Sequence, residues 1–403
     1  MRILFVADVS PVKVIGGAER VLREHTVRLA RRGHAVFVLT RGMGEDVPPI
    51  VSIEGVSVYR LPGKPVTPIT LLFSSLWHSS RMFNRVAREI KPDLINFHQP
   101  VTALGVLLSP MSWKIPKVYT FHSPSFLEYE IRTKMRGLNW FRRLSARLGI
   151  LVRRVAEYIC LRSCHKVVVL SQFSKQLLRK YHRIPETKVA VIPGGVDTNR
   201  FAPPPDRKSM RRALRIPDGR IFLFTLRNLV PRMGLENLLL AMKQLRAVGN
   251  DVFLVIGGEG VLEEELKKLA HKLGLEHMVR FEGYISDGDL PMYFQGADYF
   301  VLPTRFLEGF GLVTVEALAC GTPVLGTPVG GTLEILSGLD PTLLTKGTEP
   351  EDIVEVIKQH ITDGALARLP QLRKRCRRFA VEHYDWERVI DRLEDVFLNT
   401  TEP

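Results

Sequence analysis

The sequence predicts an α/β protein made of two doubly wound, Rossmann-like domains in tandem, with a ligand cleft between the domains. Short runs of β-branched and aromatic residues alternate with amphipathic helical patterns along the chain, which indicates parallel sheets covered on both faces. Near the middle, a cluster of proline and glycine interrupts this alternation. Each half then has the size of one domain, and ligands of such sheets bind at the carboxyl ends of the strands.

The first half of the chain starts with the strand RILFVAD, an amphipathic helix that ends at Gly33, and the strand AVFVLT. The apolar runs DLINFH, KVYTFH and KVVVLS are the next expected strands, and each is followed by helical or loop sequence. We therefore expect residues 1–192 to form the first domain. The stretch VIPGGVDTNRFAPPPD has no apolar period and marks a linker over residues 193–205.

The alternation restarts in the second half with the strand RIFLFTL and the helix GLENLLLAMKQLRAVG. The strands DVFLVIGGEG, VRFEGY and DYFVLPT follow, separated by the helical patterns EEELKKLAHKLGL and DLPMYFQGA. We expect residues 206–375 to form the second domain. Residues 376–403 are expected to be a helical segment that packs back towards the first domain.

The composition is that of a soluble globular protein. The 403 residues are 45% hydrophobic and 25% charged. The first apolar run is too short for a signal peptide, and no run approaches the roughly 18 residues of a membrane span. The four cysteines are too sparse for a disulfide framework and favour a reducing compartment. These features predict a cytoplasmic protein, with peripheral attachment to the inner face of the membrane left open.

The net charge of +15 indicates attraction to an anionic partner. Basic residues concentrate between residues 131 and 156, where no acid occurs and apolar and aromatic residues are interleaved with them. Such a helix can lie on an anionic membrane surface. A core helix with a solvated arginine face explains the same pattern equally well. Because no RNA- or DNA-binding signature accompanies the charge, we expect no nucleic-acid partner.

Residues 308–323, EGFGLVTVEALACGTP, place two acids in an otherwise apolar stretch, although a buried carboxylate is costly without partners. Glu308 precedes a helix that starts between Gly309 and Leu312, whose free N–H groups can hold a phosphate. Glu316 falls near the second turn of this helix. Carboxylates at these positions could accept hydrogen bonds from sugar hydroxyls, which suits a nucleotide-sugar. The alternative is that Glu308 is exposed and that Glu316 pairs with an arginine.

Three other features could contribute to a site. Gly16 and Gly17 end the loop after the first strand, where glycines let the backbone approach an anion, although any such loop can use glycines. His98 and His122 each follow a buried strand at its carboxyl end. A capping or core role is as consistent with His98 as a ligand-binding one.

The stretch EGFGLVTVEALACGTPV resembles the Glu-x7-Glu motif of retaining glycosyltransferases of family 4, which have the GT-B fold. The resemblance continues in order through GGAERV, RRGHAVFVLT, YTFHS, VVLSQFSKQLL, VIPGGVDTNRF, VGGTLEIL and DWERV, so it covers both domains. It implies a hexosyltransferase that moves a sugar from a UDP- or GDP-sugar to an acceptor hydroxyl with retention of configuration, in glycoconjugate or polysaccharide biosynthesis. No cofactor and no metal ion are expected. The acceptor stays open, and a lipid-linked one would suit the basic segment.

The resemblance also implies roles for individual residues. His122 and Glu308 would be catalytic, with His122 beside the reacting sugar and Glu308 accepting from the hydroxyls of that sugar. Glu316 would accept from the ribose hydroxyls, and His98 would lie on the acceptor side. The other donor-binding residues would be Gly16, Gly17, Arg227, Arg232, Gly309, Phe310, Gly311 and Leu312.

One segment departs from the family pattern, which usually places an Arg and a Lys on the diphosphate. Here Asn228 and Met233 occupy those two positions, and Arg227 and Arg232 each lie one residue earlier. We expect Arg232 to reach the phosphate more readily than Arg227. The departure keeps two other functions open, a non-catalytic nucleotide-sugar-binding protein and a nucleotide-sugar epimerase of the same architecture. Transfer requires an acceptor, epimerisation does not, and a binding protein does neither.

Overall fold

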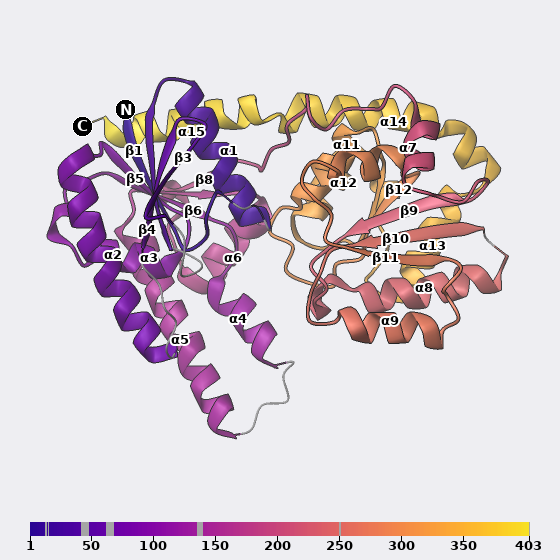
Figure 1. The fold of residues 1–403 in the computed structure, drawn as a ribbon, viewed down its shortest axis with the longest axis horizontal. Coiled ribbons are helices and arrows are strands. Elements are labelled where there is room, and N and C mark those ends of the chain that lie inside the picture. The colour runs from indigo at the N-terminus through magenta and orange to yellow at the C-terminus, as the bar shows by residue number, and fades with distance from the viewer. Residues whose placement is uncertain are drawn as a thin grey trace. The chain divides into compact units, whose positions relative to one another are not determined.

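The computed structural model describes residues 1–12, 14, 16–41, 48–61, 68–134, 140–249 and 251–402. The chain divides into two compact units, Met1–Pro193 with Glu387–Pro403, and Gly194–Trp386 (Figure 1). Each unit contains a sheet with helices packed on it, which confirms the prediction of two Rossmann-like α/β domains. Residues 194–205, expected to be a linker, belong to the second unit, and so do residues 376–386.

The first unit is built on an eight-stranded sheet of order β3-β4-β2-β1-β5-β6-β7-β8. Neighbouring strands pair in parallel, except that β3 and β4 are antiparallel. The central strands are mainly apolar and are buried on both faces, as is typical of parallel sheets. The strands are β1 (Arg2–Ala7), β2 (Ala35–Arg41), β3 (Ile50–Ile53), β4 (Val56–Leu61), β5 (Leu94–Phe97), β6 (Lys117–Phe121), β7 (Lys166–Val169) and β8 (Val189–Val191).

Helices cover this sheet. They are α1 (Gly17–Arg31), α2 (Pro68–Ile90), α3 (Pro100–Leu107), α4 (Ser125–Lys134), α5 (Trp140–Ser163) and α6 (Gln172–His182), with the 3-10 turns η1 (Pro110–Ser112) and η2 (Glu186–Lys188). Helix α3 packs between α2 and α5. A side chain at Gly105 of α3 would lie 2.6 Å from the Cβ of Ser79, so glycine is what allows α2 and α3 to pack this closely.

The last helix, α15 (Trp386–Thr401), returns to the first unit from Glu387 onward. Phe397 is fully buried, with its ring edge-on to that of Phe5 at 6.2 Å between centroids. The Arg32 side chain, at the end of α1, forms ion pairs with three carboxylates of α15, those of Glu387, Asp391 and Glu394. These contacts make the end of the chain part of the first domain.

The second unit has a five-stranded parallel sheet of order β11-β10-β9-β12-β13. Its core is rich in aromatic rings, with Phe224 surrounded by Tyr293, Phe294 and Phe300. The strands are β9 (Ile221–Leu226), β10 (Val252–Gly257), β11 (Val279–Gly283), β12 (Tyr299–Leu302) and β13 (Val324–Gly326).

Helices precede and separate these strands, and the last helices of the unit follow β13 in succession. The helices are α7 (Arg207–Ala213), α8 (Leu235–Ala247), α9 (Glu263–Lys272), α10 (Leu290–Gly296), α11 (Leu312–Ala319), α12 (Gly330–Leu339), α13 (Pro350–His360) and α14 (Asp363–Tyr384), with the 3-10 turns η3 (Pro231–Met233) and η4 (Pro341–Leu343). Within the described ranges of both units, no helix combines the length and apolar character needed to cross a bilayer.

Candidate functional site

The best-defined polar cluster of the second unit lies where β9 and β12 end. These strands are neighbours in the sheet, so Arg227, directly after β9, meets Thr304, two residues after β12. The Arg227 guanidinium donates to the Glu308 carboxylate and, at 2.9 Å, to the Thr304 hydroxyl. Thr304 in turn donates to Glu308 at 3.2 Å. Arg227 and Glu308 are only 7% and 9% exposed, and a buried pair persists only with such additional hydrogen bonds.

The residues at the positions of the expected Arg and Lys differ in burial. Met233, at the lysine position, is buried, and its sulfur lies 2.8 Å from the Arg227 guanidinium. Asn228, at the arginine position, is exposed. Arg232 donates at 2.9 Å to the carbonyl oxygen of Leu307. Both arginines of the segment therefore hold the loop that carries Glu308.

The backbone around Glu308 is fixed from two sides. Leu307 has a φ of 61°, a left-handed conformation that costs a bulky residue about 1–3 kcal/mol and needs support from its surroundings. Arg232 supports its carbonyl group. On the other side, the Gly331 amide donates to the Glu308 carbonyl at 3.0 Å, and a side chain at Gly330 would overlap that carbonyl. The direction of the Glu308 carboxylate is thus set by separate segments of the fold.

The turn after Glu308 leads into α11, and two buried hydroxyl groups lie beside it. Gly311 precedes the helix with a φ of 91°, which only glycine adopts readily. The hydroxyls of Thr314 and Thr332 are buried and have no hydrogen-bond partner in the described part of the chain. A Cβ at Gly311 would lie 3.0 Å from each hydroxyl and 3.7 Å from the Glu308 side chain. Because buried hydroxyls normally have a partner, these two could donate to a ligand.

The other residues predicted in this stretch lie around the same turn. Gly309 is partly exposed, and Leu312 begins α11. Phe310 is buried against Gly194, where a Cβ would come within 2.6 Å of its ring. Glu316 is buried, 4% exposed, in the second turn of α11. Thr314 and Thr332 were not predicted as site residues, although Thr314 is a polar residue in the apolar run of the motif.

In the first unit the structure brings the two predicted histidines together. His98 follows β5 and His122 follows the neighbouring β6, and their ring nitrogens Nδ1 and Nε2 are 3.0 Å apart. His25, from α1, lies edge-on to His98 with 5.8 Å between ring centroids. Burial lowers the pKa of His25 to about 3 and that of His122 to about 4, and it lowers the pKa of His98 well below its usual value. The three imidazoles are therefore neutral at pH 7.

Beside Gly16 lies an acid that sequence reasoning missed, Glu19 in the first turn of α1. Gly16 precedes α1, and its amide hydrogen-bonds to the Glu19 carboxylate. Burial raises the pKa of Glu19, and the neighbouring carboxylate of Glu128 adds to the rise. Ser123, next to His122, donates to Glu128 at 2.5 Å. A Glu three residues inside a helix that begins with glycine was the available signal, because such a side chain can reach back to the helix start.

No group of three or more His, Cys, Asp or Glu side chains with metal-binding geometry occurs in the residues that the structure describes.

Comparison with known proteins assigns the family. The model "Glycosyltransferase Family 4" matches residues 15–200, and the model "Glycosyl transferases group 1" matches residues 206–383. The chain is 30% identical over 414 residues to a D-inositol 3-phosphate glycosyltransferase of Saccharomonospora viridis, covering 96% of this chain and 89% of the relative. The protein therefore belongs to glycosyltransferase family 4.

Solved structures show the same fold. A sucrose-phosphate synthase of Thermosynechococcus elongatus aligns with a TM-score of 0.84 at 22% identity, covering 99% of each chain. The HepE protein of Anabaena, solved in complex with UDP-glucose, aligns with a TM-score of 0.75 at 20% identity, covering 99% of this chain and 100% of its own. The fold is GT-B, and the chain is a transferase of glycosyl groups.

The Arg227–Glu308 pair predicts strong coupling between the two residues. Arg227→Met or Glu308→Gln alone should lower the free energy of unfolding by about 3–5 kcal/mol, because each leaves a buried charge without its partner. The double variant should cost clearly less than the sum, by about 1 kcal/mol or more. Urea unfolding measures the cycle. Glu308→Gln combined with Arg280→Met is the control, since Arg280 pairs with Glu282 and its effect should add. An additive result for Arg227 and Glu308 would contradict the coupling.

The buried histidines predict a pH dependence of stability. An unfolded chain binds protons at His25 below its ordinary pKa of about 6.5, whereas the folded protein does so only near pH 3. Stability should therefore fall as the pH decreases from 6.5, by about 2 kcal/mol at pH 5 for this residue. His25→Gln should reduce the stability difference between pH 7 and pH 5 by that amount, measured by urea unfolding. His271→Gln, at a side chain 82% exposed, should leave the difference unchanged. If both variants lost the same stability between pH 7 and pH 5, the prediction would be refuted.

Proposed function

We propose that this glycosyltransferase moves a sugar from a nucleoside-diphosphate sugar, carried on UDP or GDP, to an acceptor hydroxyl with retention of anomeric configuration. The observation that carries the proposal is the fixed, buried carboxylate of Glu308 beside the turn that opens α11. A carboxylate held in this way accepts hydrogen bonds from sugar hydroxyls. The turn beside it offers donors for a diphosphate.

Two kinds of hydrogen-bond donor would stabilise the diphosphate. The first N–H groups of α11 point out of the helix and carry its positive dipole end. The hydroxyls of Thr314 and Thr332 lie beside the same turn without partners in the described part of the chain. Because negative charge develops on the leaving diphosphate, these fixed dipoles would favour the transition state. The HepE structure with UDP-glucose supports a nucleotide-sugar as the donor.

The hydrogen bonds that hold the Glu308 carboxylate also affect how the anomeric configuration of the sugar can be retained. Glu308 already accepts from Arg227 and Thr304, which makes it a poor covalent nucleophile. Attack of the acceptor on the same face of the sugar, with the leaving diphosphate taking the acceptor proton, retains configuration without such a nucleophile. A neutral His122 imidazole could accept or donate a hydrogen bond to the reacting sugar without adding charge.

The donor proposal predicts that one nucleoside diphosphate raises the melting temperature. At 100 times its Kd, such a ligand adds about 2.7 kcal/mol of stability. Glu308→Gln should keep the affinity for this diphosphate within a few-fold and lower transfer by on the order of 100-fold, as removal of one transition-state interaction does. Calorimetry and a radiolabelled transfer assay measure the two effects, with the exposed Glu265→Gln as control.

The outcomes also separate the competing functions. Sugar conversion without an acceptor would identify an epimerase. Nucleotide-sugar binding without turnover would identify a binding protein, and it would point to Asn228 and Met233 as the reason for lost activity.

We further propose that α5 contacts an anionic membrane, which would suit a lipid-linked acceptor. Residues 135–139 of the basic segment 131–156 lie outside the described residues. In the described part, Arg147 and Arg154 are exposed. Beside them runs an exposed apolar stripe at helical spacing, formed by Leu144, Leu148, Leu151, Val155 and Ile159. Exposed apolar side chains next to arginine are the chemistry of an interfacial helix.

Vesicle binding tests the membrane proposal. Wild-type protein should bind phosphatidylglycerol vesicles at low salt and release at high salt, because the attraction is screened. The variant Leu148→Ser with Leu151→Ser should bind at least 5-fold more weakly. Lys268→Gln with Lys272→Gln, at exposed lysines of the second unit, is the control. Equal binding to neutral phosphatidylcholine vesicles would overturn the proposal.

A further inference from the structure

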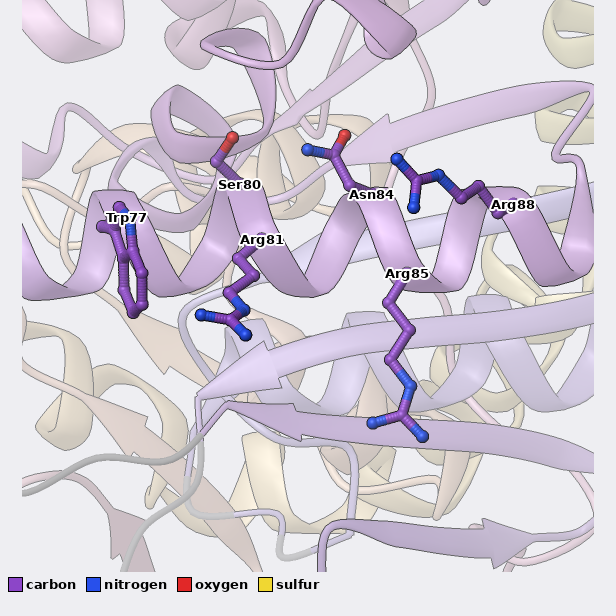
Figure 2. A pocket seen from close by; sticks show the side chains of 6 residues that line it. All are labelled: Trp77, Ser80, Arg81, Asn84, Arg85 and Arg88. Carbon is purple, nitrogen blue, oxygen red and sulfur yellow. The ribbon is translucent and has the colours of Figure 1, made fainter.

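A hollow of about 480 Å³ lies on the surface of α2, on the first unit. Figure 2 shows its lining side chains in two rows along the helix. Trp77, Arg81 and Arg85 point to one side of α2, and Ser80, Asn84 and Arg88 project from the other. The hollow therefore brings three guanidinium groups, one indole and two neutral polar groups to one stretch of surface.

The three arginines differ from several surface arginines of this unit that have acidic partners. Arg2, Arg23 and Arg31 each pair with an acid on the surface. By contrast, no ion pair is formed by Arg81, Arg85 or Arg88 with any residue that the structure describes, and the one acid next to them in sequence, Glu89, is 3.5 Å from the Tyr59 hydroxyl. Like charges four residues apart on a helix repel each other, so this cluster opposes helix stability unless an anion neutralises it.

The chemistry of the arginines selects a phosphate group. Guanidinium presents its donors as a planar fork that matches the oxygens of phosphate, and it is weakly hydrated compared with ammonium. Arginines at positions i, i+4 and i+7 lie within two turns of the helix, close enough to surround one anion. A solvated face would be served equally well by lysine, which this stretch does not contain.

The remaining lining groups select a ring with hydroxyls. The Trp77 indole is 56% exposed, and the Arg81 guanidinium covers it at 5.2 Å from the ring centroid. The exposed indole offers a flat apolar surface with a polar edge, against which a sugar ring can pack. Asn84 accepts a hydrogen bond from the Ser109 hydroxyl through its amide oxygen. This bond orients Asn84 and leaves its NH₂ group to donate to a ligand.

The hollow is separate from the histidines of the first unit. Helix α2 follows β4 and leads to β5, so it runs from the carboxyl edge of the sheet to the amino edge, where Asp93 hydrogen-bonds the start of β1. The lining residues lie along its course towards the amino edge. His98 and His122 follow the carboxyl ends of β5 and β6. We propose that the hollow on α2 is a second ligand site, which binds a phosphate group carried on a hydroxylated ring, either as a free sugar phosphate or as a lipid headgroup.

Calorimetry without donor or acceptor tests the site independently of sugar transfer. Glucose 6-phosphate should bind the wild-type protein, and glucose should not. The triple variant Arg81→Gln, Arg85→Gln and Arg88→Gln should weaken this binding at least 10-fold. Because all three side chains are exposed, the fold should be unaffected, which circular dichroism verifies. The control is Lys243→Gln, Lys268→Gln and Lys272→Gln, which removes the same charge from exposed positions of the second unit and should change the affinity less than 2-fold.

Two further measurements identify the chemistry and source of the ligand. Trp77→Ala should weaken glucose 6-phosphate at least 3-fold and leave inorganic phosphate within 2-fold. Arginine-dependent binding of glucose 6-phosphate supports the site with a free ligand. If the protein instead binds only phosphatidylinositol vesicles, not phosphatidylcholine vesicles, and this binding depends on the arginines, the site is supported and its ligand is a lipid headgroup. Binding of neither probe, or equal loss in the lysine control, overturns the proposal.

Discussion

The buried ion pair between Arg227 and Glu308 is the constraint on which the second unit's site depends. Removing two charges from water is costly, and their attraction offsets this only when the geometry is fixed and the remaining polar atoms have partners. Here Thr304 hydrogen-bonds both groups, and the Met233 sulfur contacts the guanidinium. The pair therefore ties the end of β9 to the loop after β12. Any movement of Glu308 would expose a charge to an apolar interior, so its carboxylate is held in one direction.

Close backbone contacts hold the turn around Glu308 in addition to the ion pair. The Glu308 carbonyl lies against Gly330, and Phe310 lies against Gly331 and Gly194, at distances that leave no room for a Cβ. Glycine costs conformational entropy on folding, so its use at three such contacts reflects a requirement for proximity. As a result, the turn into α11 is packed between segments that are distant in sequence. The hydroxyls of Thr314 and Thr332, which have no hydrogen-bond partner in the described part of the chain, lie beside this turn.

The sequence predicts the fold well because its signals are local. Alternating strand and helix patterns predict the central strands of both sheets but not β3, β4, β8 or β13. Helix α11 begins at Leu312, within the expected range. Side-chain partners are less accessible, since they depend on contacts between distant segments. The alternative of an exposed Glu308 is wrong, because the residue is buried and pairs with Arg227. Nothing in the local pattern shows that Arg227 points into the unit while Asn228 points out.

Buried ionisable groups are stabilised in two different ways in this enzyme. In the second unit a charged group is retained because an opposite charge lies against it. In the first unit no acid is hydrogen-bonded to the His98–His122 pair in the described part of the chain, and burial keeps both rings neutral. A neutral ring can donate through one nitrogen and accept through the other, whereas an imidazolium can only donate. The pair thus keeps both hydrogen-bonding roles at neutral pH, so it matches both the donor and the acceptor capacity of a hydroxyl group.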